Sequence, residues 1–139
     1  SAESCTGGLI AGACTQLAGS SDWFDAGIVS YANDAKTALL GVPAPMLQAH
    51  GAVSEPVARA MAEGALARTR AQLAVAVTGI AGPGGAVRGK PVGTVWLATA
   101  GPGGTRAERL QLDGDRDAVR AQTVAVALQR MTERALAGT

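Results

Sequence analysis

Residues near the start of the chain combine a hydroxyl, a thiol and glycines in a way that suits acyl-transfer chemistry. The segment SAESCTGG places Ser4 and Cys5 directly before residues that favour a helix. Free backbone N–H groups at a helix start carry partial positive charge and can hold an oxyanion. Ser4 could therefore act as a nucleophile, with Cys5, Thr6 and Gly7 at the helix N-terminus around the oxyanion. The alternative is that Ser4 only caps the helix, a role for which serine is favoured.

A serine nucleophile needs a base, and the single histidine, His50, has no evident relation to Ser4. Lys36 is the candidate, because a lysine whose pKa is lowered by burial can accept a hydroxyl proton. Tyr31, at the end of the preceding predicted strand, is expected to relay that proton or to hold the lysine. The alternative is that Lys36 is an ordinary surface lysine.

Two further segments could bind an anionic ligand. Thr78, Gly79 and Gly82 follow a predicted buried strand, and ligands of α/β proteins bind at the carboxyl ends of strands, where glycine lets backbone N–H groups approach a phosphate. Arg116 and Arg120 lie four residues apart near the start of the last predicted helix, where cations oppose the helix dipole. We expect one of them to contact a phosphate or carboxylate. A tight structural turn and local neutralisation by neighbouring aspartates are the alternatives.

Helical and strand patterns alternate along the chain and must position these residues. We predict five helices: residues 5–17, a helix from 33 or 34 to 40, residues 43–50, a longer helix capped by Ser54, and residues 115–136. We predict strands at 27–31, 73–77, 92–99 and 108–112. The last two strands flank GPGG and should form a hairpin. This order predicts one three-layer α/β domain with a mixed sheet.

Bulk properties exclude several classes of partner. The 139 residues are 47% hydrophobic and carry a formal net charge of +1, with acidic and basic residues interspersed. We expect no nucleic acid or membrane partner, and a cytoplasmic protein. Cys5 and Cys14 would lie roughly 13 Å apart on one helix, too far for a disulfide. Two cysteines and one histidine make a structural zinc site improbable.

Motifs from nearly the whole chain resemble one known family. They are AESCTGG, GSSDWFDAGIVSYANDAK, HGAVSEPVA, TGIAGPGG, KPVGTVW and GDRDAVR. They are similar to the family formed by the C-terminal domain of CinA and its stand-alone form, nicotinamide mononucleotide deamidase. Family members usually begin with a helix and a strand ahead of AESCTGG, so we expect residues 1–139 to form a single domain that lacks both.

The resemblance implies a three-layer α/β/α fold of the Rossmann-like type, in a homodimer or higher homo-oligomer. It also implies hydrolysis of the carboxamide of nicotinamide mononucleotide to nicotinate mononucleotide and ammonia. It implies Ser4 as nucleophile, Lys36 as its base, and supporting or substrate-binding roles for Tyr31, Thr78 and one of Arg116 and Arg120. The mechanism requires no metal and no organic cofactor. The alternative is a non-catalytic regulatory module that binds a nucleotide or another phospho-ligand while Ser4 caps its helix.

Overall fold

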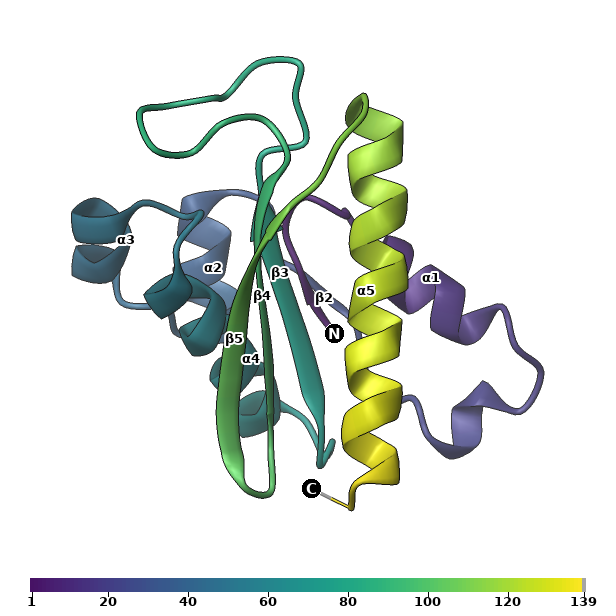
Figure 1. The fold of residues 1–139 in the computed structure, drawn as a ribbon. Helices are drawn as coiled ribbons and strands as arrows, with labels where there is room; N and C mark the ends of the chain where they lie inside the picture. The colour runs from purple at the N-terminus through teal and green to yellow at the C-terminus, as the bar shows by residue number, and fades with distance from the viewer. Residues whose placement is uncertain (139) are drawn as a thin grey trace.

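A five-stranded sheet lies between two layers of helices in the computed structural model, which describes residues 1–138 (Figure 1). The strands are β1 (Ala2–Glu3), β2 (Ile28–Val29), β3 (Ala74–Gly79), β4 (Thr94–Gly101) and β5 (Gly104–Gln111). The helices are α1 (Leu9–Thr15), α2 (Asn33–Leu40), α3 (Ala44–His50), α4 (Glu55–Arg68) and α5 (Arg116–Leu136), with a short 3₁₀ helix at Ser20–Asp22. The expected three-layer α/β fold with a mixed sheet is confirmed.

The sheet has a parallel part and an antiparallel part. In the order β2-β1-β3-β4-β5, β1 runs parallel to both of its neighbours, while β4 runs antiparallel to both β3 and β5. The chain passes from β1 to β2 on one side and later returns to β3 on the other side of β1. The carboxyl ends of β1 and β3 therefore flank the point where the strand order reverses, which is where α/β sheets bind ligands.

Each face of the sheet has its own apolar core. Helices α2, α3 and α4 cover one face, and α1 and α5 cover the other (Figure 1). On the first face Val57 and Met61 of α4 are fully buried beside Leu40 at the end of α2. On the second face Val119 and Ala127 of α5 are fully buried in the other cluster. The two cores hold the sheet edge that carries the candidate site from both sides.

A glycine sets how closely α2 approaches α4. A Cβ atom on Gly64 would lie 2.0 Å from the carbonyl oxygen of Leu40, so no side chain fits there without moving α2. Gly41, with φ 71°, ends α2 in a left-handed turn, as its position after the helix predicts. The close packing fixes the helix that carries Lys36.

The structure corrects the prediction for the start of the chain. The first helix begins at Leu9 rather than Cys5, with Gly8 at its N-cap, so Ser4 and Thr6 precede the helix. The reason is the backbone of Gly7 and Gly8, whose φ angles of 57° and 107° do not belong to a right-handed helix. Ala2–Glu3, to which no strand was assigned from sequence, form the strand at the switch point.

The other elements follow the predictions closely. Helix α5 ends at Leu136 and its N-cap is Asp115, whose carboxylate accepts a hydrogen bond of 2.9 Å from the Ala118 N–H. Strands β4 and β5 form the predicted hairpin through the GPGG turn, although β5 already begins at Gly104. The predicted strand over 27–31 is shorter, at Ile28–Val29.

Candidate active site

Ser4 and Lys36 meet at the carboxyl edge of the parallel strands. Ser4 follows β1 directly, and its N–H donates a hydrogen bond of 3.1 Å to the carbonyl of Val77 in β3. Lys36 projects from the first half of α2, and its Nζ lies 3.0 Å from Ser4 Oγ. The structure thus brings together a hydroxyl and an amine that are 32 positions apart in sequence.

Burial prepares Lys36 to act as a base. Its side chain is only 1% exposed, and desolvation lowers the pKa of its ammonium group, because a charged amine loses hydration inside the protein. Within residues 1–138, no carboxylate lies within ion-pair distance of Lys36. A lysine in such surroundings can be neutral and can accept a proton through its lone pair.

Tyr31 holds the lysine through its backbone, not through its phenol. Lys36 Nζ donates a hydrogen bond of 2.8 Å to the Tyr31 carbonyl oxygen. The side chain of Tyr31 is 59% exposed, and its hydroxyl lies 3.4 Å from Nη2 of Arg116. Of the two predicted roles, the position fits holding the lysine and does not fit relaying a proton between Ser4 and Lys36.

The helix N-terminus that was expected to bind an oxyanion instead binds the carboxylate of Glu3, a residue not singled out from the sequence. Glu3 is fully buried. Its carboxylate accepts hydrogen bonds from Ser1 Oγ (3.0 Å), Thr6 Oγ1 (2.6 Å) and the N–H groups of Gly8 (3.2 Å), Ile10 (2.9 Å) and Ala11 (2.9 Å). The first turn of α1 is therefore satisfied by a side chain of the protein. An acidic residue just before a helix start was the available signal, since carboxylates are favoured there.

Only part of the predicted oxyanion site remains open. The Gly7 N–H donates a hydrogen bond of 3.0 Å to the Ser4 carbonyl, so it is not free for a ligand. Within the described chain, the N–H groups of Cys5 and Thr6 donate to no other residue, and the Cys5 N–H interacts only with its own thiol. The Cys5 thiol is a poor alternative nucleophile, because burial raises its pKa to about 11.

The three predicted residues at the end of β3 and in the loop after it differ in their relation to the cavity. Thr78 is 1% exposed, and its hydroxyl donates a hydrogen bond of 3.0 Å to the Ala52 carbonyl, which ties the segment before α4 to the end of β3. Gly79 lies at the cavity beside Ser4, and Gly82 does not. The Gly82 carbonyl instead accepts a hydrogen bond of 2.9 Å from Arg116 Nη1.

The two arginines of α5 have different surroundings. Arg116 lines the cavity that contains Ser4 and Lys36. Arg120 points to the backbone of the loop after β1, with Nε 3.1 Å from the Cys5 carbonyl and Nη2 3.4 Å from the Thr6 carbonyl. Arg116 is thus the one of the pair that is placed to meet a ligand.

A cavity of about 220 Å³ connects these groups. Its lining residues are Ser4, Cys5, Tyr31, Asn33, Lys36, Ala52, Val53, Thr78, Gly79, Ala81 and Arg116. Asn33, for which no role in the site was predicted, is the first residue of α2, and the N-cap of that helix is Ala32. A second hollow of about 500 Å³ shares Ala81 and Arg116 with this cavity.

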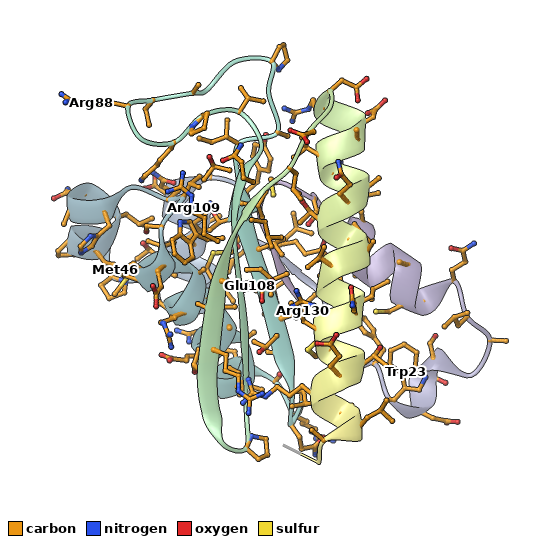
Figure 2. All side chains as sticks on the ribbon, in the orientation of Figure 1. Trp23, Met46, Arg88, Glu108, Arg109 and Arg130 are labelled. Carbon is orange, nitrogen blue, oxygen red and sulfur yellow. The ribbon has the colours of Figure 1, made fainter. Side chains whose placement is uncertain are left out.

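Trp23 of the motif GSSDWFDAGIVSYANDAK lies away from this cavity, whereas Cys5 is part of its lining. Trp23 is 58% exposed and lies beyond α5 and α1, on the opposite side of the sheet from α2 (Figure 2). Cys5 and Cys14 are free thiols. Over residues 1–138, no group of three or more His, Cys, Asp or Glu side chains could hold a metal ion. In the same part of the chain, no helix is long and apolar enough to span a bilayer.

Fold and site together define an α/β protein with a buried serine–lysine pair at the switch point of its sheet. Residues 1–135 match the family model of the CinA C-terminal domain. The chain belongs to the CinA C-terminal domain family, as its motifs suggested.

Relatives and solved structures agree with this membership. The chain is 53% identical to the nicotinamide-nucleotide amidohydrolase PncC of Escherichia coli (strain K12), over 99% of this chain and 84% of that protein. It is 58% identical to a putative competence-damage inducible protein of Symbiobacterium thermophilum, over 99% of this chain but only 34% of that protein. The chain thus spans about a third of the length of this relative and of several CinA-like proteins. A competence/damage inducible protein from Agrobacterium tumefaciens has a similar fold, with a TM-score of 0.92, 52% identity and coverage of 95% of this chain and 81% of that one.

Proposed function

We propose that this chain hydrolyses the carboxamide of nicotinamide mononucleotide to nicotinate mononucleotide and ammonia, with Ser4 as nucleophile and Lys36 as base. The substrate is taken from the name of the E. coli relative and the family resemblance. The chemistry is supported by the site itself. It is an amide hydrolysis by a serine–lysine pair that uses only side chains and backbone groups of the protein.

The observation that carries this proposal is the burial of Lys36 against Ser4. An isolated buried ammonium group is costly, and buried lysines without a carboxylate partner are rare. A lysine used only for structure would be stabilised better by acceptors that fully surround it. Here Nζ has one carbonyl partner at 2.8 Å and the hydroxyl of Ser4 at 3.0 Å, which suits a group that alternates between protonated and neutral forms.

The first half of the reaction forms an acyl-enzyme. Neutral Lys36 accepts the proton of the Ser4 hydroxyl as Oγ attacks the carboxamide carbon. The carbonyl oxygen becomes an oxyanion that the N–H groups of Cys5 and Thr6 stabilise. The protonated lysine then donates its proton to the departing nitrogen. The C–N bond breaks, and ammonia leaves with an ester on Ser4 remaining.

The second half restores the enzyme. A water molecule enters the position vacated by ammonia, and Lys36, again neutral, accepts one of its protons. Hydroxide attack on the ester carbon forms a second tetrahedral oxyanion at the same donors. Its collapse returns the proton from Lys36 to Ser4 Oγ and releases the carboxylic acid product. The carbonyl of Tyr31 holds Nζ in place in both protonation states, since even a neutral amine keeps two N–H donors.

The arrangement of the two hollows supports a mononucleotide substrate. The cavity beside Ser4 admits the carboxamide end, and the larger hollow on the far side of Arg116 can take the rest of the molecule. Arg116, at the boundary between them, carries a positive charge that can pair with the phosphate. An uncharged riboside would lack this contact.

The decisive test is release of ammonia from nicotinamide mononucleotide by the purified chain and by Ser4→Ala. We expect turnover by the parent and a loss of about 10³-fold or more in kcat for the variant, because the nucleophile is removed. The Ser4 side chain is not an N-cap, so the variant should fold, which a thermal melt checks. Tight binding of the mononucleotide without any ammonia release would contradict the proposal and favour the regulatory module.

A further inference from the structure

The N–H groups of Cys5 and Thr6 are unusual for buried backbone. Thr6 is fully buried and Cys5 is 6% exposed. In the described residues neither N–H donates to another residue, although nearly all buried backbone donors in proteins are paired, and the Cys5 N–H interacts only with its own thiol. Two such donors directly after Ser4, one of them from a residue that lines the cavity, point to a ligand atom as their partner. Something must hold them in this orientation while the site is empty.

Arg120 binds the carbonyl side of the Cys5–Thr6 peptide, the unit that carries the Thr6 N–H. Its Nε and Nη2 donate to the carbonyls of Cys5 and Thr6, at 3.1 and 3.4 Å. The peptide between Cys5 and Thr6 is trans, so its C=O and N–H point in opposite directions. Because the Cys5 carbonyl points toward α5, the Thr6 N–H points away from α5. It therefore points to the side of the sheet on which α2 carries Lys36.

Glu3 restrains the loop from within. Its carboxylate receives the Thr6 hydroxyl at 2.6 Å and the N–H groups at the start of α1. Together with the hydrogen bond of 3.0 Å from the Leu9 N–H to the Thr6 carbonyl, these bonds satisfy the donors at the start of α1. They also fix the side chain of Thr6, whose own N–H must stay open. The buried anion and the guanidinium thus act on the same short loop through different atoms.

We propose that Arg120 and Glu3 are positioning residues, which together orient the Cys5–Thr6 peptide so that its N–H group, that of Thr6, stabilises the oxyanion. This inference rests on the proposed amide hydrolysis, and it gives Arg120 a role different from binding the substrate phosphate. Neither side chain touches the substrate. Each acts by restricting the orientation of the backbone N–H donor. Donors that are already oriented need not reorganise when the oxyanion forms, so they stabilise it more strongly.

The primary test compares Arg120→Met with Arg130→Met. Arg130, also on α5, pairs with Glu108 on β5, away from the loop (Figure 2). We expect Arg120→Met to lower kcat for nicotinamide mononucleotide by about 10²- to 10³-fold, the effect of losing an oxyanion donor, with KM changed less than about threefold. Arg130→Met should retain the parent kcat. Arg120→Lys, which can still donate to one carbonyl, should recover part of the loss.

A second measurement separates positioning from a general structural role. The aldehyde counterpart of the substrate, in which CHO replaces the carboxamide, adds to Ser4 Oγ as the hydroxyl proton passes to Lys36 and the aldehyde oxygen becomes an alkoxide. Its inhibition constant should rise in Arg120→Met by the same factor as kcat falls, while affinity for the product is unchanged. Thr6→Val, which removes only the hydroxyl donated to Glu3, should shift both quantities in the same direction but less.

The outcomes are distinct. A parent protein that releases no ammonia contradicts the proposed function itself. An active parent with an Arg120→Met variant of equal kcat, melting at a comparable temperature, overturns the positioning role. A variant that loses activity on the mononucleotide but not on the riboside would show that Arg120 binds phosphate instead, and would overturn it as well.

Discussion

Two cations are buried at opposite ends of this molecule, and their surroundings differ. Lys36, 1% exposed, sits at the carboxyl edge of the parallel strands. Arg134, 2% exposed, lies near the end of α5 beside the β4–β5 turn. Arg134 donates to the carbonyls of Thr99, Pro102 and Gly104 and to the Thr99 hydroxyl.

The difference distinguishes a cation that holds the fold from one that can react. Desolvation lowers the pKa of both side chains, and the neighbouring Arg106 lowers that of Arg134 further. A guanidinium nevertheless remains protonated in proteins, and here it satisfies several carbonyls of the hairpin turn. The amine of Lys36 has fewer partners and can lose its proton. Stability should therefore depend on Arg134 and activity on Lys36.

Lys36→Met should produce the largest effect. We expect kcat to fall by about 10³-fold or more, because the general base is lost and Ser4 is no longer activated. Thermal stability should be retained or increased near neutral pH, since an apolar side chain avoids the cost of desolvating an amine. If Lys36→Met unfolds while Arg134→Met remains stable, Lys36 and not Arg134 would be the cation that holds the fold. Lys36→Arg should also be inactive, because arginine cannot act as the base.

The pH dependence follows from the same group. Because desolvation places the pKa of Lys36 below its ordinary value, the folded protein binds fewer protons than the unfolded chain between the two pKa values. The free energy of unfolding should therefore rise with pH across that interval. Activity should rise with pH through the lowered pKa of Lys36 in the folded protein, level off above it, and be lost as the pH falls below it. The check is kcat/KM and the free energy of unfolding as functions of pH, with Lys36→Met as the reference that lacks this slope in stability.

Arg134→Met should cost about 3 kcal/mol in the free energy of unfolding, because several buried carbonyls lose a charged donor. The kcat of the folded variant should stay near that of the parent. Arg130→Met is the matched control, since its ion pair with Glu108 is partly exposed and worth about 1 kcal/mol or less. Denaturant unfolding measures both changes. Equal losses in the two variants would contradict a special role for the buried guanidinium.

Arg116→Ala tests a third cation, which is exposed and faces the cavity. We expect kcat/KM for the mononucleotide to fall by roughly 10- to 150-fold, the value of one charge-assisted hydrogen bond, with little change for the riboside. Equal losses on both substrates would mean that Arg116 acts through the fold or on the reacting amide.

The smallest effect is expected for Cys5→Ala. The thiol is buried and its pKa is about 11, so it is protonated at neutral pH and unreactive as a nucleophile. The proposed contribution of Cys5 comes from its backbone N–H, which alanine keeps. We expect kcat/KM within about threefold of the parent. A large loss in a stably folded variant would give the sulfur a role in the reaction.

Local signals in the sequence predicted most of the fold but not the details of the loop that carries Ser4. Gly41 and Asp115 mark helix ends through well-understood backbone and side-chain preferences, and the hairpin follows from its turn. The start of α1 was missed because two glycines with positive φ interrupt a segment whose composition favours a helix. Strand β1 is too short for a periodic pattern and exists only because β2 and β3 flank it.

The candidate site was predictable in its types of residue and less so in its contacts. Ser4 and Lys36 were paired from their chemistry, and the structure places them 3.0 Å apart. The roles of Tyr31 and Arg120 depend on which atoms face the site, and sequence carries no information about the rotation of a helix or the direction of a carbonyl. Glu3 went unnoticed because its partners are mostly backbone N–H groups.

The two-residue strand β1 also has a consequence for the order in which the chain folds. Its pairing joins Ala2 to Ile28 and Ala76, whereas the β4–β5 hairpin joins residues that are close in sequence. Closing long loops costs entropy before any contact compensates it, so the hairpin and its flanking helices should form early and β1 should join the sheet late. Ser4 reaches Lys36 only after that step. In a refolding experiment, ammonia-releasing activity should therefore return after most of the secondary structure has formed.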